Sequence, residues 1–115
     1  MAISEFEIKR LEKLVGQYVQ KIRPPARIRN ELDIDFRIRQ QSVEILEVRP
    51  AWNDPSKKLE HNVAKATYVK STGMWKVYWQ RADLKWHSYQ PKPMVATIEE
   101  FLAVVEEDQH GCFFG

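Results

Sequence analysis

Three histidines and one cysteine are the side chains best suited to bind a metal or act as a nucleophile: His61, His87, His110 and Cys112. A structural zinc site takes four ligands, usually as two closely spaced pairs. Only His110 and Cys112 form such a pair, and two further ligands would have to come from distant segments. His110 is also the one base near Cys112 in the sequence that could activate the thiol. We therefore expect no metal, no cofactor and no catalytic residue, and we favour a protein that is not an enzyme.

A second kind of chemistry is suggested by the stretch WKVYWQRADLKWHSY at positions 75–89. It contains three of the four tryptophans and two of the four tyrosines. Residues 65–92 carry six Lys and Arg against Asp83 alone, whereas residues 93–115 carry five acidic residues and no Lys or Arg. Single-stranded nucleic acid is bound by cations along its phosphates and by flat rings that stack on its bases. The stretch is therefore either a binding surface or a hydrophobic core.

The strands that carry this stretch decide between the two. NVAKATYVK and WKVYWQR are typical strands joined by a turn at STGM, and KWHSY follows a turn around Ala82 and Asp83. Side chains alternate between the two faces of a strand, so the length of the second turn sets which residues share a face. We expect an even-length turn that pairs Trp79 with Trp86, because an odd one would divide the tryptophans between both faces. This register gives the core face Ala64, Ala66, Tyr68, Trp75, Val77, Trp79, Leu84 and Trp86.

The opposite face is then both basic and aromatic. We expect its ligand-binding residues to be three lysines that neutralise phosphates, two tyrosines that stack on bases, and one histidine between them: Lys65, Lys76, Lys85, Tyr78, Tyr89 and His87. Two other interpretations remain open. The face could be an ordinary solvated one, because Lys, Thr and Tyr are common on exposed strands, or one of the helices could cover it.

Amphipathic helices are expected near both ends of the chain. Ser4 and Glu7 have capping-box spacing, and apolar residues recur at intervals of three and four until RPP at 23–25 stops the run. Thr97 and Glu100 repeat the capping spacing in front of a second apolar stripe. The stripe of the first helix is nearly a heptad seam, which leaves open a homodimer.

Two more strands are expected between the first helix and the aromatic stretch. LDIDFRIR alternates strictly, and SVEILEVR changes phase, which predicts a bulge near Ile45 and Leu46. The two strands should pair through a turn at Gln40 and Gln41. RPAWNDPSKK at 49–58 contains two prolines and predicts a loop that Trp52 pins to the body of the domain.

Composition bounds the fold. The 115 residues, 43% hydrophobic and 30% charged, are typical of one globular domain. We predict a single α+β domain over residues 1–115: a helix, a four- to five-stranded antiparallel sheet and a second helix, with the helices packed mainly on the tryptophan face. One cysteine allows no internal disulfide, and MAISEFEIKR has no apolar signal segment, so we expect the cytoplasm. No apolar run is long enough to span a membrane, and no membrane partner is expected.

Three segments together resemble a known family: RPAW, WKVYWQRADLKWHSY and the ending DQHGCFFG. They are similar to a family of small uncharacterised bacterial proteins, domain of unknown function 3024, and the resemblance runs over nearly the whole chain. It implies a single complete domain. It implies no activity, cofactor or catalytic residue, because the family has none established.

The function that these observations favour is a non-catalytic binding module. Its first expected ligand is RNA or single-stranded DNA on the basic and aromatic sheet face. The alternative is a protein–protein interaction module or homodimer that uses the first helix and the apolar C-terminus. At that C-terminus, Phe113 and Phe114 are expected to fold back on the core, with capture by a protein partner as the other interpretation.

Overall fold

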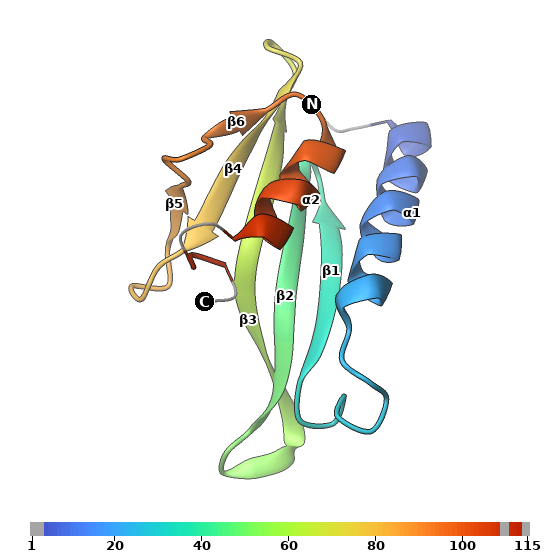
Figure 1. Ribbon diagram of the computed structural model, residues 1–115, viewed down its shortest axis with the longest axis vertical. Helices are drawn as coiled ribbons and strands as arrows, with labels where there is room; N and C mark the ends of the chain where they lie inside the picture. The colour runs from blue at the N-terminus through green and yellow to red at the C-terminus, as the bar shows by residue number, and fades with distance from the viewer. Residues whose placement is uncertain (1–3, 109–110, 114–115) are drawn as a thin grey trace.

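The computed structural model describes residues 4–108 and 111–113, which form two helices and one antiparallel sheet (Figure 1). The elements in chain order are α1 (Glu5–Ile22), β1 (Asp33–Arg39), β2 (Ser42–Ala51), β3 (Asp54–Val69), β4 (Met74–Gln80), β5 (Trp86–Ser88), β6 (Met94–Val95) and α2 (Ile98–Glu107). The strands lie in the order β1-β2-β3-β4-β5, and β6 pairs with β4. The α+β class and the order helix, sheet, helix are thus confirmed.

Both helices begin at the caps that the sequence predicts. The Ser4 hydroxyl accepts a hydrogen bond from the Glu7 N–H, and the Thr97 hydroxyl accepts one from the Glu100 N–H, both at 3.2 Å. These bonds satisfy backbone donors that the first turn of a helix leaves unpaired. Helix α1 ends at Ile22, and the guanidinium of its C-cap residue, Arg23, donates two hydrogen bonds to the Asp33 carboxylate at 2.8 and 2.7 Å. This bidentate pair joins the end of α1 to the start of β1.

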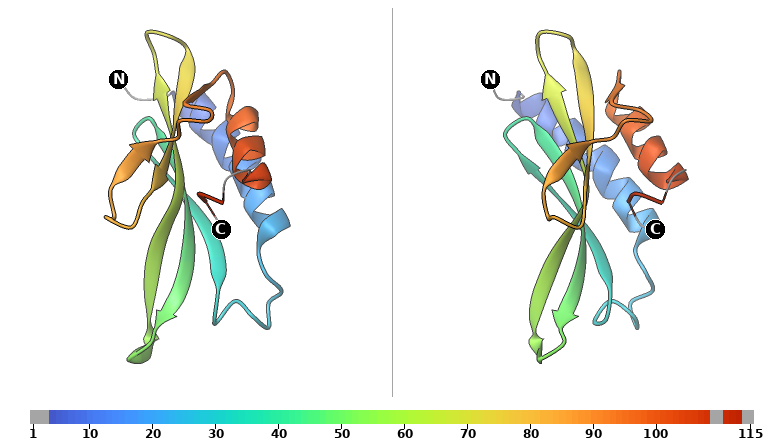
Figure 2. Two further views of the ribbon diagram at one scale, coloured as in Figure 1. Left: turned by 60° about the vertical axis from the view of Figure 1, so that its left-hand side comes forward. Right: turned by 90° about the vertical axis from the view of Figure 1, so that its left-hand side faces the viewer.

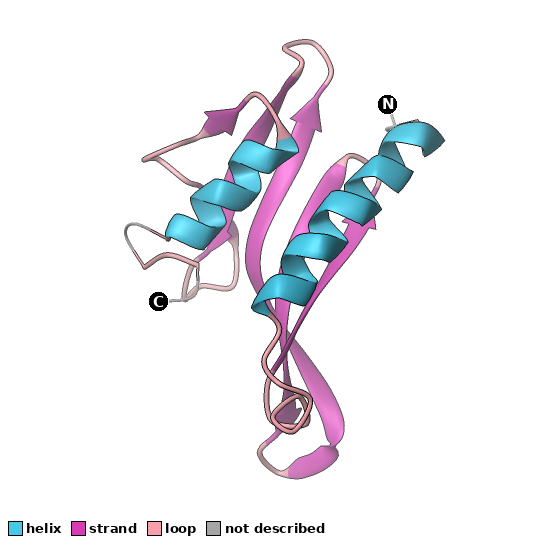
Figure 3. Ribbon diagram, turned by 45° about the vertical axis from the view of Figure 1, so that its right-hand side comes forward, coloured by secondary structure: helices cyan, strands magenta, loops and turns pink. Residues whose placement is uncertain are grey.

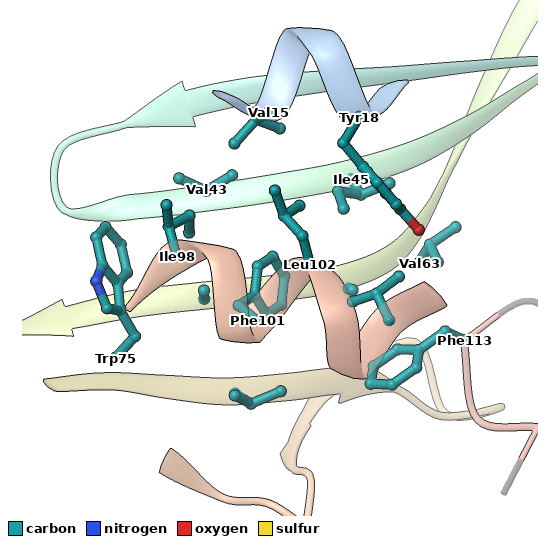
Figure 4. Packing of buried hydrophobic residues seen from close by; sticks show 14 of the residues in the cluster. Val15, Tyr18, Val43, Ile45, Val63, Trp75, Ile98, Phe101, Leu102 and Phe113 are labelled. Atoms are coloured by element: carbon teal, nitrogen blue, oxygen red, sulfur yellow. The ribbon is translucent and has the colours of Figure 1, made fainter. Parts of the chain in front are cut away.

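The two helices lie side by side on one face of the sheet (Figures 2 and 3). Helix α1 buries Leu11, Val15, Tyr18 and Val19, and α2 buries Ile98, Phe101, Leu102 and Val105. Ion pairs link their outer sides, Arg10 to Glu99 at 3.2 Å and Lys21 to Glu106 at 3.0 Å. Figure 4 shows Phe101 and Leu102 of α2 directed toward Val43, Ile45 and Val63 of the sheet. The core therefore lies between the helices and one sheet face, as predicted.

The first part of the sheet follows the predicted register. Strands β1 and β2 pair from Arg39 opposite Ser42, across the turn at Gln40 and Gln41. The predicted irregularity is also present, because the pairing of β2 with β3 shifts between Ile45 and Leu46. The extra residue is Val63 on β3, and both Val63 and Ala64 join the core cluster. A bulge permits this, because it breaks the alternation of side chains at one point.

The segment at 49–58 differs from its prediction. It is not a loop against the body of the domain but the end of a long β2–β3 hairpin that extends beyond the helices (Figure 1). Its tight turn at Trp52 and Asn53 leaves the Trp52 side chain 94% exposed. The prolines misled the prediction, since Pro50 and Pro55 fall where the pairing of the two strands is irregular, and a strand tolerates proline there.

The C-terminal segment folds back in part as predicted. Phe113 is buried, its ring centroid lies 4.8 Å from that of Tyr89, and its N–H donates to the Asp108 carboxylate at 3.0 Å. Phe114 and His110 lie outside the described residues. None of the helices in the described part of the chain is both long and apolar enough to cross a membrane.

Candidate functional site

The turn between β4 and β5 has odd length, so the predicted pairing of Trp79 with Trp86 is wrong. Gln80 pairs with Trp86 and Trp79 pairs with His87. The Leu84 N–H closes the turn by donating to the Arg81 carbonyl at 2.8 Å, and Leu84 itself has a φ of 62°. A turn that ends in one left-handed residue is the usual three-residue hairpin loop, and it normally carries glycine at that position. Because leucine and not glycine occupies this position, the sequence shows no sign of a three-residue turn.

The odd turn moves Trp86 to the sheet face that the helices leave free, here called the open face. In its part nearest β4 and β5, its described members are Arg37, Arg39, Ser42, Glu44, Lys65, Thr67, Lys76, Tyr78, Gln80, Trp86 and Ser88, which follow from the pairings of the five strands. Toward the tip of the β2–β3 hairpin the same pairings add Asp35, Leu46, Glu60 and Asn62. The alternate positions, such as Val43, Ala66 and Val77, are buried under the helices. In Figure 2, β5 lies on the side of the sheet away from the helices, so the open face is bent at this edge.

One row of the open face carries exposed cations at both ends. Arg39, Ser42, Thr67 and Lys76 lie opposite one another on four successive strands. The Ser42 and Thr67 hydroxyls are 2.8 Å apart and share a hydrogen bond, while Arg39 and Lys76 are exposed. This row presents two positive charges and two hydroxyls without an acidic residue.

The next row mixes charge with aromatic side chains. Arg37, Glu44, Lys65 and Tyr78 lie opposite one another on β1 to β4. Glu44 is buried at 8% exposure, and the Arg37 guanidinium lies 3.5 Å from its carboxylate and 3.4 Å from that of Glu60. The buried carboxylate is therefore compensated by a neighbouring cation, as a buried charge requires.

Lys65 is the centre of the open face. Its ammonium lies 5.0 Å from the Tyr78 ring centroid and 4.9 Å from that of Trp86, within cation–π distance of both. Burial between these rings lowers the pKa of Lys65, and the carboxylate of Glu44 opposes that shift. Tyr78 and Trp86 are half-buried, so part of each ring remains accessible to a ligand. The arrangement can hold an anionic group next to a flat one.

Only three of the six predicted ligand-binding residues lie together on this face: Lys65, Lys76 and Tyr78. Lys85 is exposed in the turn, where its N–H donates to the Asp83 carboxylate at 2.9 Å. His87 lies in the row of Trp79 and its Nε2 is 2.9 Å from the Asp83 carboxylate. Tyr89 is 2% exposed against Phe113, and burial raises the pKa of its hydroxyl. The prediction that Tyr89 stacks on a base is therefore wrong.

Trp86 and Arg39 are two open-face residues suited to ligand contact that the sequence prediction did not include. Trp86 was assigned to the core because the turn length was wrong. Arg39 stood in the strictly alternating segment LDIDFRIR, whose polar side was already visible in the sequence. Extending the row from Lys76 across the sheet would have identified it.

Metal and thiol chemistry gain no support within residues 4–108 and 111–113, where no three His, Cys, Asp or Glu side chains lie close enough to hold an ion. Burial, and secondarily the charge of Asp108, raises the pKa of the Cys112 thiol. A thiol with a raised pKa is a weak nucleophile at neutral pH. The Asp83 carboxylate has a lowered pKa, first because of the Lys85 N–H and then because of His87, which fits its role in closing the turn.

Comparison with known proteins places the chain in one family. The family model described as Domain of unknown function (DUF3024) matches residues 3–115, so the chain belongs to that family. No curated protein and no solved structure matches it.

Proposed function

We propose that this DUF3024 protein is a non-catalytic binding module that takes single-stranded nucleic acid, RNA or DNA, on its open face. The observation that carries the proposal is the position of the Lys65 ammonium between the Tyr78 and Trp86 rings on a sheet face free of helices. Single-strand binders combine stacking rings with cations along the backbone path, and the open face offers both.

The proposed contacts follow from the two rows. Tyr78 and Trp86 stack on bases, each with the ring face that Lys65 does not cover, and Lys65 meets the phosphate between them. Arg39 and Lys76 at the ends of the neighbouring row neutralise the phosphates that follow, and the Ser42 and Thr67 hydroxyls lie between them. This set replaces Lys85, His87 and Tyr89 of the sequence prediction with Trp86 and Arg39.

The alternative of a protein partner bound through α1 and the C-terminus is less well supported. The apolar stripe of α1 and the Phe113 ring are buried in the core. For cellular location we propose a bacterial cytoplasm, which suits a chain with one cysteine whose thiol is partly buried.

The test is fluorescence anisotropy of labelled single-stranded RNA and DNA at several salt concentrations, with variants that separate stacking from charge. Tyr78→Ala and Trp86→Ala should each weaken binding about 5- to 150-fold, the equivalent of ~1–3 kcal/mol per stacked base, and leave the salt dependence unchanged. Lys76→Gln should make the negative slope of log K against log salt shallower by about 0.7, because one phosphate contact is lost.

Lys13→Gln is the matched control, since it removes the same charge from the exposed side of α1. It should bind as the unmodified protein does. Each variant is first checked by circular dichroism, so that a loss of fold is not counted as a loss of binding. Absence of binding at low salt, or equal losses for Lys13→Gln and Lys76→Gln, would refute the proposal.

A further inference from the structure

The outer edge of β3 is unpaired over most of its length. Strand β3 runs from Asp54 to Val69, but β4 pairs only with Ala64–Val69. The segment 54–63 pairs with β2 on its inner side, and within the described chain no strand lies on its outer side. Figure 1 shows this part of the hairpin extending away from the rest of the sheet. A bare edge of this kind is a template for another strand.

Natural sheets usually protect such an edge with bulges, with prolines and with charged side chains, above all lysine. Here irregular pairings bracket five regularly paired residues, 58–62. The charges between those irregularities do not share a sign: Lys58 and Glu60 lie on either side of Leu59, which is 46% exposed. Alternating charge around an apolar residue does not repel a second copy of the same strand.

We propose that two copies of this chain pair antiparallel along this edge, centred on Leu59. In a two-fold antiparallel pair, opposite residues share a face, so the axis must pass through one residue. Centring on Lys58 or Glu60 would set like charges against each other. Centring on Leu59 sets Leu59 against Leu59 and sets Lys58 against Glu60 of the second copy, twice.

The same register has a limit where β4 begins. It places Ser56 of one copy opposite Asn62 of the other, and the β3 residues from Ala64 onward already pair with β4. The two copies therefore pair over residues 56–62 of each chain.

The pairing has a consequence for the rest of the surface. A two-fold axis perpendicular to the sheet keeps both open faces on the same side of one continuous sheet. The dimer stands independently of the proposed function, because its test uses the protein alone.

The experiment is sedimentation velocity over a wide concentration range on the unmodified protein, Lys58→Glu, Glu60→Lys, and an equimolar mixture of the two variants. The unmodified protein should dimerise. Each variant alone should associate about ten- to a hundredfold more weakly, since two opposite-charge pairs become like-charge pairs. The mixture should dimerise, because one variant then carries acidic side chains at positions 58 and 60 and the other carries basic side chains at both.

The mixture makes the test independent of any effect of one substitution on its own chain, such as loss of the Glu60–Arg37 ion pair. Lys13→Glu on α1 is the control of equal charge change and should dimerise normally. A monomer at every concentration overturns the proposal. So does a dimer that both variants form alone as well as they do when mixed, which would place the interface elsewhere.

Discussion

Replacement of Trp75 by alanine tests whether the helix-covered face is the core. Trp75 is 6% exposed, and its ring centroid lies 5.3 Å from that of Tyr68 on the neighbouring strand. Loss of a buried tryptophan typically costs about 3–5 kcal/mol, from lost burial and from the cavity left behind. For a chain of this length, 1 kcal/mol corresponds to about 4 °C in Tm. Trp75→Ala should therefore lower Tm by about 12–20 °C in a calorimetric or circular dichroism melt.

Trp52→Ala is the matched control, because the same atoms are removed from a side chain that is 94% exposed. It should change the free energy of unfolding by no more than about 0.5 kcal/mol. The melts are made at a low protein concentration, so that association between copies does not contribute. If both variants were destabilised equally, or if Trp75→Ala lost less than about 1 kcal/mol, the assignment of the core face would be refuted.

Two further predictions concern the turn and the junction between α1 and β1. Leu84→Asn should raise stability by about 0.5–1 kcal/mol, because asparagine adopts the positive φ at this position with less strain than leucine; an unchanged or lower Tm would contradict this. The Arg23 guanidinium lowers the pKa of Asp33, so this pair stabilises the fold above the ordinary pKa of an aspartate and the contribution is lost as pH falls through the lowered value. The difference in Tm between the unmodified protein and Asp33→Asn should be largest near neutral pH and shrink in strong acid, and a difference that grows in acid would show that the pair is not the cause.

Most of the fold could be predicted because local signals and burial agree. The caps at Ser4 and Thr97, the turn at Gln40 and Gln41, and the irregularity at Ile45 each have a signal within a few residues. The hairpin tip around Trp52 could not be predicted in the same way. Its two strands pair beyond the hydrophobic core, so their sequence lacks the alternation of apolar and polar residues that burial of one face produces. Its prolines also suggest a loop.

The candidate site was harder to predict because it depends on one turn. Side chains alternate between the two faces of a strand. One residue more or less in a turn therefore moves every side chain of the following strand to the opposite face. Lys65, Lys76 and Tyr78 were placed correctly because their strands are joined by the STGM turn, where Gly73 takes the positive φ of 67° expected of glycine. Lys85 lies in the turn that contains Leu84, and His87 and Tyr89 follow it, so an error in the length of this turn moved all three to the wrong face.

The burial argument for the even turn failed because it treated every tryptophan as a core residue. Trp86 is only half-buried on the open face, where the Lys65 ammonium lies over its ring at 4.9 Å from the centroid. Because Trp86 lies on the open face, His87 takes the position opposite Trp79 on the helix side, and Tyr89 packs on Phe113. The open face keeps two rings and a partly desolvated lysine at one point, and this combination supports the proposed ligand site.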